Sequence, residues 1–348
     1  MRKKVPVCII GLGRIASLLE SDELREKPCT HAGAIKADKN CVLVAGADIN
    51  AKRRRLFENK WKVPTYSDAE LMLCEEQCKI LIIATHPDSH AEYCKLAAKY
   101  KIRVVICEKP LADSLKNAKQ IAKIAGHLLE NEKYDAKNPH GMRIIVNHER
   151  RYSLDYINAR GVLKSKNLGQ IKSVRAILYM GSKQRLVDML WHDGTHLIDA
   201  IMFLTGCAIK HKNKWGASLK GKQGTAYLEA SLKPQKGGPA IVSGEVPLLI
   251  EMGAERDHLV FEIQISLSRG SLRIGNGIYE VYTSKPSPYA EGFKSLQRTK
   301  DKFDGRTGYF SNMIRDAVTC VYAHKKQPVS NVQSAMAVIE YLSSVSPL

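Results

Sequence analysis

Hydrophobic residues in the first half of the chain form short continuous runs that alternate with longer amphipathic segments. Runs that are too short for a helix and apolar at nearly every position are typical of parallel strands covered on both faces of a sheet. They occur at Val5–Ile10, at Cys41–Ala47 and at residues 80–84, 104–106 and 143–147. Between two of these runs, residues 90–101 repeat their apolar positions at helical spacing, which predicts a βαβ unit.

Beyond residue 152 the pattern changes to short, often alternating, β-prone segments separated by turns rich in Gly, Pro and Lys. These segments are residues 171–179, 225–232, 239–246, 248–252, 258–267, 271–274 and 278–283. They predict a mostly antiparallel sheet of about six to eight strands. Ahead of most of them, an apolar stretch that ends at Gly206 predicts one helix over residues 191–206, on which His192 and His196 share a face.

These elements predict an α/β protein of two domains, since 348 residues exceed the usual size of one domain. Residues 1–148 are expected to form a domain built on a parallel sheet with helices. Residues 149–348 are expected to form an α+β domain with an open, mostly antiparallel sheet.

The first predicted strand leads directly into a glycine motif. Glycine at its first two positions permits a tight turn and a close approach of the backbone to a pyrophosphate, which then meets the N–H groups of the following helix. Ala16 replaces the third glycine and is small enough for close packing. The residues expected to bind a dinucleotide here are Gly11, Gly13, Arg14 and Ile15. The polar residues 20–30 form an insertion in the first crossover.

The second predicted strand ends at Asp48, and this residue decides the expected cofactor. Its carboxylate can accept a hydrogen bond from a ribose 2′-hydroxyl and repels a 2′-phosphate, which favours NAD. Arg53, Arg54 and Arg55 follow closely and could turn toward a phosphate, so NADP stays possible. The preferred interpretation is that these arginines face water at the start of a helix.

A carboxylate and an amine follow the strand at residues 104–106, in the sequence Cys107-Glu108-Lys109-Pro110. The carboxyl ends of strands in an open α/β sheet are where ligands bind, so this edge is where chemistry is expected. The preceding strand ends in the polar turn at residues 85–89, which adds side chains at the same edge.

Composition narrows the class of protein without changing the fold. The net charge of +19 is spread over both halves and lacks a concentrated basic stripe, so no nucleic-acid partner is expected. The nine cysteines include no CxxC pair, and no zinc set or other metal site is expected. No run approaches the roughly twenty apolar residues of a spanning helix. A cytoplasmic protein without membrane contact is therefore expected.

Several motifs together resemble the Gfo/Idh/MocA oxidoreductases, which include glucose-fructose oxidoreductase and inositol dehydrogenase. The motifs are the opening glycines, residues 84–90, 107–112, 146–152 and 192–199, and more faintly a helix near residues 334–342. The resemblance implies that Thr85, His86, His90 and Glu108 line the cofactor, with Glu108 near the nicotinamide ribose. For His90, a plain role at the start of a helix is an equal alternative.

The resemblance also implies the catalytic residues. His196 aligns with the family's histidine and is expected to remove the hydroxyl proton, because an unperturbed imidazole titrates near pH 6.5. Lys109 is expected to bind the same oxygen and stabilise its negative charge, or to share the proton. His192 stands where the family has an aspartate, so its role departs from the family pattern.

The resulting hypothesis is an NAD-dependent oxidoreductase that moves hydride between nicotinamide and a hydroxyl or keto carbon of a sugar, cyclitol or related polyol. Two alternatives stay open, an NAD-dependent glycosidase of the same family and a non-catalytic protein that senses NAD and sugar. The resemblance further implies that residues 1–148 are a Rossmann NAD(P)-binding domain and that residues 149–348 bind the substrate and mediate oligomerization. A homodimer or homotetramer formed through the C-terminal sheet is therefore expected.

Overall fold

The computed structural model describes residues 3–126, 142–181, 184–211, 219, 224–235, 241–300, 303, 305–323 and 326–345. The chain forms two compact units. One comprises Met1–Tyr152 with Gly308–Ile339, and the other comprises Ser153–Thr307 with Glu340–Leu348. This division differs from the predicted domains 1–148 and 149–348, because a segment near the end of the chain packs with the first unit.

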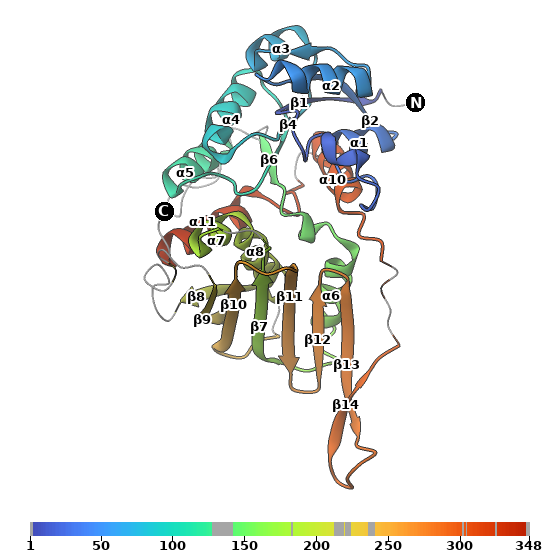
Figure 1. Ribbon diagram of the computed structural model, residues 1–348, viewed down its shortest axis with the longest axis vertical. Coiled ribbons are helices and arrows are strands. Elements are labelled where there is room, and N and C mark those ends of the chain that lie inside the picture. The colour runs from blue at the N-terminus through green and yellow to red at the C-terminus, as the bar shows by residue number, and fades with distance from the viewer. Residues whose placement is uncertain are drawn as a thin grey trace. The chain divides into compact units, whose positions relative to one another are not determined.

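The first unit contains a six-stranded sheet in the order β3-β2-β1-β4-β5-β6, and every pairing is parallel (Figure 1). The strands are β1 (Val5–Ile10), β2 (Cys41–Ala47), β3 (Thr65–Tyr66), β4 (Ile80–Ile83), β5 (Val104–Cys107) and β6 (Arg143–Val146). The strand order reverses between β1 and β4, which is where dinucleotides bind in sheets of this kind. The predicted Rossmann fold is confirmed.

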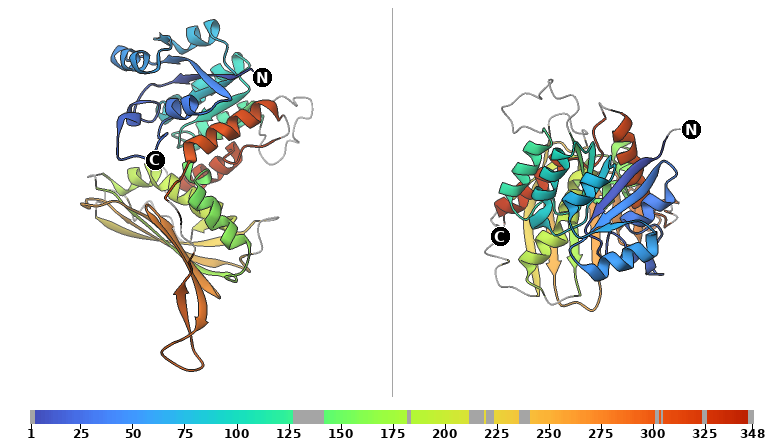
Figure 2. Two further views of the ribbon diagram at one scale, coloured as in Figure 1. Left: turned by 90° about the vertical axis from the view of Figure 1, so that its right-hand side faces the viewer. Right: turned by 90° about the horizontal axis from the view of Figure 1, so that it is seen from above.

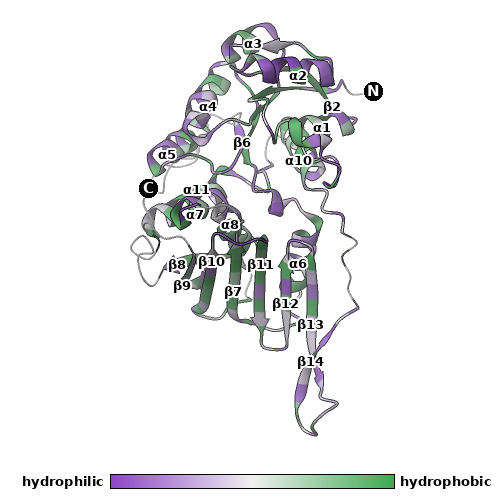
Figure 3. Ribbon diagram, in the orientation of Figure 1, coloured by the Kyte–Doolittle hydropathy of each residue, from purple (hydrophilic) through white to green (hydrophobic). Residues whose placement is uncertain are grey.

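Helices follow the strands of this sheet, including the helix predicted over residues 90–101. They are α1 (His31–Ala37), α2 (Ala51–Trp61), α3 (Ala69–Glu75), α4 (His90–Lys99) and α5 (Leu115–Ile124), with short 3-10 helices η1 (Leu18–Ser21), η2 (Pro87–Ser89) and η3 (Glu149–Arg151). Helix α2 buries only Phe57 and is largely hydrophilic (Figure 3). It is therefore a surface helix. Arg54 is half-buried and donates to the carbonyls of Asp48 and Ile49, so the prediction that all three arginines face water is wrong for Arg54.

Two helices from the end of the chain are α10 (Tyr309–Tyr322) and α11 (Val332–Val345). Helix α10 lies beside α1 and packs on β4 and β5 (Figure 1). Its buried residues Phe310, Met313 and Ile314 join a core cluster with Ile82 and Ile106 of those strands. The first unit is therefore completed by residues that the sequence prediction assigned to the second domain.

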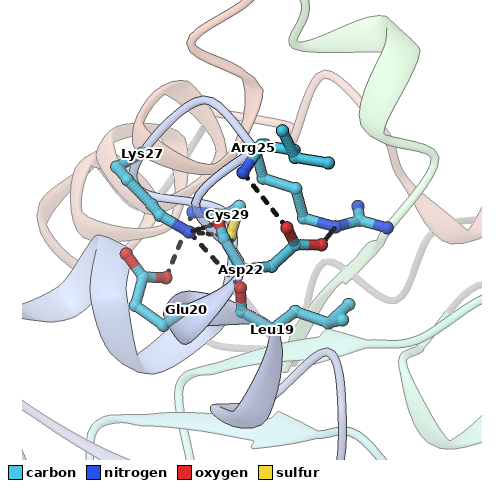
Figure 4. Close-up of polar contacts among 7 residues, drawn as sticks. Leu19, Glu20, Asp22, Arg25, Lys27 and Cys29 are labelled. Atoms are coloured by element: carbon cyan, nitrogen blue, oxygen red, sulfur yellow. Dashed lines mark hydrogen bonds and ion pairs between the residues drawn. The ribbon is translucent and has the colours of Figure 1, made fainter.

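The insertion between the glycine motif and α1 is a closed excursion of residues 18–30. At its end, the backbone N–H groups of His31 and Ala32 donate to the carbonyls of Ile15 and Ala16, at 3.1 and 3.0 Å. Inside it, the Lys27 ammonium donates to the carbonyls of Leu19 and Asp22 (Figure 4). Helix α1 thus continues the helical turn that follows the glycine motif, with the excursion inserted between the two.

The second unit contains an eight-stranded sheet in the order β14-β13-β12-β11-β7-β10-β9-β8, in which β7 and β10 are parallel and the other pairs antiparallel. The strands are β7 (Ile171–Tyr179), β8 (Cys207–His211), β9 (Thr225–Pro234), β10 (Val246–Gly253), β11 (Val260–Leu267), β12 (Gly270–Gly275), β13 (Ile278–Pro286) and β14 (Lys294–Arg298). The β13–β14 hairpin extends beyond the rest of this sheet (Figures 1 and 2). The predicted antiparallel sheet is confirmed.

Three details of the second unit differ from the prediction. Strands β8 and β14 were not predicted, and residues 241–246 do not form a separate strand, since a single strand starts at Val246. The remaining residues of that predicted segment, 239 and 240, lie outside the described residues. The predicted helix over residues 191–206 is two helices, α7 (Leu186–His192) and α8 (Gly194–Thr205).

One face of this sheet is apolar and the other is polar, because side chains alternate along each strand. Helix α6 (Leu154–Lys164) contacts β12, and α8 contacts β7. The polar face carries two glutamates that are buried beside arginines from neighbouring strands. Glu262 is bonded by the Arg273 guanidinium, with Nε to Oε1 at 2.6 Å and Nη2 to Oε2 at 2.7 Å. Arg175 makes a single bond to Glu251, from Nη2 to Oε2 at 2.7 Å, and the Tyr179 hydroxyl donates to Oε1.

Within the described part of the chain, no helix combines the length and the apolar character that crossing a membrane requires.

Candidate active site

The glycine motif lies at the point where the strand order reverses, between the carboxyl ends of β1 and β4. Gly11 has a φ of +85°, and a Cβ added there would meet the Ala84 carbonyl oxygen at 2.6 Å. A side chain is therefore excluded by both conformation and space. At Gly13 the nearest atom to an added Cβ is Nη1 of Arg53, at 3.9 Å. Gly13 thus leaves the backbone open on a side where packing would admit a methyl group, which fits close approach of a pyrophosphate.

The glycine motif is followed by one turn and not by a complete helix. The N–H groups of Ser17 and Leu18 both donate to the Gly13 carbonyl, at 3.1 and 3.3 Å. Arg14 is exposed and Ile15 is half-buried in this turn. The helix expected directly after the motif is interrupted by the excursion at residues 18–30 and resumes as α1.

Asp48 lies under this loop, as its place at the end of β2 predicts. Its Oδ2 accepts the N–H of Leu12 and its Oδ1 accepts the N–H of Asn50, both at 2.8 Å. The Arg53 guanidinium approaches the same carboxylate at 3.6 Å. Only 4% of the Asp48 side chain is exposed. Asp48 therefore fixes the glycine loop to the end of β2, a contact between residues 36 positions apart.

The turn after β4 brings Thr85, His86 and His90 to the same edge. Thr85 and Ser89 share a hydroxyl hydrogen bond of 2.7 Å, and His86 is exposed. Both ring nitrogens of His90 lie 3.2 Å from backbone carbonyls, those of Thr85 and Leu111. His90 is fully buried, and this burial lowers its pKa. It joins the loops after β4 and β5, and its direct contact with the cofactor stays a prediction.

Glu108, at the end of β5, is held by two residues that the sequence analysis did not assign. Its Oε1 lies 2.7 Å from Nε2 of His31 and accepts the side-chain amide of Asn147 at 2.7 Å. His31 is fully buried, with its ring edge-on to Phe310 at 5.0 Å. Both bonds end on Oε1. Within the described residues no hydrogen bond reaches Oε2, which can therefore accept one from a ligand hydroxyl.

The charge state of Glu108 follows from the same contacts. Burial by itself raises the pKa of this carboxyl group, but the hydrogen bond from His31, the charge on that ring and the bond from Asn147 outweigh it. The net effect lowers the pKa below its usual value. Glu108 is therefore an ionised carboxylate at the sheet edge at neutral pH.

A second carboxyl group, Glu149, shares this edge because β6 pairs with β5 in parallel. Asn147 follows β6, and its N–H donates to the carbonyl of Cys107 at 2.8 Å. Burial raises the pKa of Glu149, while the charges of Arg150, Glu108 and Lys109 also act on it. The charge of Lys109 therefore acts on two carboxyl groups, Glu108 and Glu149.

In the second unit, His192 and His196 belong to different helices. The break falls at Asp193, and an added Cβ at Gly194 would meet the Leu190 side chain at 2.9 Å, so glycine lets the two helices pack closely. The mostly exposed His192 ring has Nδ1 3.1 Å from the Asp193 carboxylate. His196 lies half-buried in the first turn of α8. The single-helix prediction is wrong here, whereas the predicted cap at Gly206 is confirmed by its φ of +66°.

The signal for Asn147 was present in the sequence. Once the last two strands are predicted to be parallel neighbours, the residue after β6 must lie beside the residues after β5. His31 carried no such signal, because it lies 77 residues from Glu108 and beyond the excursion.

Comparisons with known proteins agree with this geometry. Residues 5–128 match the model of an oxidoreductase family with an NAD-binding Rossmann fold, which confirms the family resemblance of these residues. The glucose-6-phosphate 3-dehydrogenase of Bacillus subtilis is 26% identical over 211 residues, which are 56% of this chain and 52% of that protein. The chain thus spans about half the length of this curated relative.

Solved structures show the same fold over nearly the whole chain. A putative NADPH-dependent oxidoreductase from Desulfitobacterium hafniense superposes with a TM-score of 0.74 at 16% identity, covering 98% of this chain and 94% of that one. A putative myo-inositol dehydrogenase from Sinorhizobium meliloti gives a TM-score of 0.68 at 15% identity, covering 98% and 95%. At such identities the likeness establishes the two-domain architecture.

Proposed function

We propose that the chain is an NAD-dependent dehydrogenase acting on a hydroxyl-bearing carbon of a sugar, cyclitol or related polyol. The match of residues 5–128 to the model of the Gfo/Idh/MocA oxidoreductase family supports this proposal. The reaction is reversible in principle, so the same site reduces the matching ketone. The similarity to a glucose-6-phosphate 3-dehydrogenase supports this substrate class, and the shared fold with a putative myo-inositol dehydrogenase is consistent with it.

The observation that carries the proposal is the grouping of Gly13, Asp48 and Glu108 at one edge of the parallel sheet. Gly13 leaves open backbone for a pyrophosphate, and Asp48 holds that loop against β2. Glu108 keeps one carboxylate oxygen for a ribose hydroxyl. These three features fit a dinucleotide stretched across the point where the strand order reverses.

Each protein group then has a chemical task. Bound NAD supplies the hydride acceptor at its nicotinamide ring. Lys109 directly follows the ribose-binding carboxylate, and its ammonium donates a hydrogen bond to the substrate oxygen and stabilises the charge that forms there. His196 accepts the hydroxyl proton as general base. His192 assists His196 in this proton transfer, and the Asp193 carboxylate fixes the orientation of the His192 ring.

The decisive variant is Lys109→Ala. Loss of the ammonium should lower kcat by about a hundredfold to ten-thousandfold, as is usual when a group acting on a developing charge is removed. The dissociation constant for NADH, measured by nucleotide fluorescence, should change less than about threefold, since Lys109 acts on the substrate. The control is Lys119→Ala, which removes an exposed lysine of α5 and should leave both values unchanged.

The measurement uses a broad panel of polyols and phosphorylated sugars, with free NADH followed at 340 nm. Unchanged turnover in Lys109→Ala would remove Lys109 from the mechanism. Release of free NADH from a simple polyol excludes the NAD-dependent glycosidase. Tight NADH binding without turnover on any member of the panel would overturn the dehydrogenase and leave the sensor of NAD and sugar.

The expected assembly is a homodimer or homotetramer formed through the second sheet. The polar face of that sheet, with its paired glutamates and arginines, is the surface we assign to it. Sedimentation velocity of the purified chain tests this, and a monomer at micromolar concentration would contradict it.

A further inference from the structure

The guanidinium group of Arg53 lies beside the glycine loop. Arg53 is the third residue of α2, whose first turn is fixed by the Asn50 side chain accepting the Arg53 N–H at 3.1 Å. From there Nη1 of Arg53 reaches within 3.9 Å of the Cβ position of Gly13 and within 3.6 Å of Oδ2 of Asp48. A positive charge thus stands where the loop and the end of β2 meet.

Asp48, in contrast, is withdrawn from solvent. Its two oxygens accept backbone N–H groups from Leu12 and Asn50, and only 4% of its side chain is exposed. The Arg53 side chain is 48% exposed. At this place the solvent-accessible charge is therefore cationic, and the carboxylate that would repel a phosphate is screened by two N–H groups and a guanidinium.

The other two arginines of the cluster do not share this position. Arg54 donates through Nη1 to the carbonyls of Asp48 and Ile49, at 2.7 and 3.1 Å, so it closes the end of β2. Arg55 is exposed, and no polar partner is recorded for it among the described residues. Arg53 is thus the arginine that faces both Gly13 and Asp48.

We propose that Arg53 determines cofactor specificity, by binding the 2′-phosphate of NADP(H), so that this chain accepts NADP(H) although an aspartate ends β2. This rests on the proposed dinucleotide-binding function. A guanidinium binds a phosphate through two parallel N–H groups, and the half-exposed Arg53 has donors left for that contact. NAD(H) lacks the phosphate and gains nothing from Arg53.

Fluorescence titration of the full chain with NADPH and with NADH tests the proposal without needing a substrate. The native chain should bind NADPH within about tenfold of NADH, and Arg53→Ala should weaken NADPH binding about tenfold to hundredfold while changing NADH less than threefold. Arg55→Ala removes the same charge two residues further along the helix, on a different face, and should leave both affinities unchanged.

Competition isolates the 2′-phosphate. Adenosine 2′,5′-bisphosphate should displace NADPH from the native chain at lower concentration than 5′-AMP does, and Arg53→Ala should abolish that difference. Higher salt should weaken NADPH binding more than NADH binding, because an exposed ion pair is screened.

The outcomes separate the two proposals. If NADH binds and NADPH binds more than a hundredfold weaker, or if Arg53→Ala and Arg55→Ala act alike, the role of Arg53 is overturned while the dehydrogenase stands. If neither nucleotide binds the native chain, the dinucleotide-binding function fails, and the role of Arg53 with it.

Discussion

Glu108 in the first unit and Glu262 in the second are both buried carboxylates, but their partners differ. Glu262 has both oxygens held by the Arg273 guanidinium, a permanent charge that neutralises it. Glu108 is bonded on one oxygen by His31 and Asn147, neither of which is permanently charged. The Glu262 carboxylate is fully used in a structural ion pair, whereas Glu108 keeps one oxygen and its negative charge for a ligand. A buried carboxylate therefore indicates a binding site only when one of its oxygens is still able to accept a hydrogen bond.

The comparison is tested most strongly by Arg273→Ala. It leaves Glu262 buried without its counter-ion, and breaking such a pair costs about 3 kcal/mol of unfolding free energy. NADH affinity should stay within twofold, because the change lies in the second sheet. Urea denaturation measures the loss.

A matched control is Arg298→Ala, which removes an exposed arginine 3.3 Å from Glu280. Because the guanidinium of this pair is exposed, the pair should contribute less than about 1 kcal/mol. Equal losses in the two variants would mean that Glu262 is not held by Arg273 as described.

The next largest effect is expected for Glu108→Gln. The amide oxygen can still accept the Asn147 bond, so stability should fall by less than about 1 kcal/mol, whereas NADH affinity should fall about tenfold to hundredfold through loss of a charged acceptor. Glu262→Gln should do the reverse, lowering stability and leaving NADH affinity unchanged. The distinction between the two carboxylates is wrong if both variants lose affinity equally.

The smallest effect concerns the pH dependence of stability. Burial raises the pKa of Glu149, so the folded state holds this proton more tightly than the unfolded state does. The free energy of unfolding must then decrease as pH rises from the ordinary carboxyl value of 4.5 through the raised pKa. Glu149→Gln should therefore gain up to about 1 kcal/mol at pH 7.5 and nothing at pH 4.5.

Glu262 should show the opposite slope. The Arg273 hydrogen bonds lower the pKa of Glu262. Glu262 therefore contributes to the free energy of unfolding at pH values above the ordinary carboxyl pKa, and this contribution is lost as pH falls through the lowered pKa of the folded state. Denaturation curves of Glu149→Gln and Glu262→Gln across this range measure both slopes. A Glu149→Gln gain that does not vary with pH would show that ionisation is not its cause.

Much of the first unit could be predicted because its strands are buried on both faces and appear as unbroken apolar runs. The end of each run then located Asp48, Thr85 and Glu108, and the structure places all three at one sheet edge. The partners of these groups could not be found in this way. His31 meets Glu108 through the packing of α1, which depends on contacts across the whole unit.

The second unit was harder to predict because its strands are only half buried. Strand β14 alternates half-buried and exposed residues and contains Lys294 and Arg298, so it lacks an apolar signal. The break at Asp193 was equally hidden, since the apolar pattern continues across it and only Gly194 marks it. The place of α10 was missed because amphipathic periodicity shows that a face is buried but not which sheet covers it.

The excursion at residues 18–30 has a consequence for reading related sequences. Two backbone hydrogen bonds, from His31 and Ala32 to Ile15 and Ala16, join the ends of the excursion. The path of the helix therefore does not depend on the number of residues in the excursion. The histidine that supports Glu108 is therefore placed by three-dimensional register and not by its count from the glycines. Relatives with shorter or longer loops can keep the same histidine in space, and a fixed-spacing motif would overlook it.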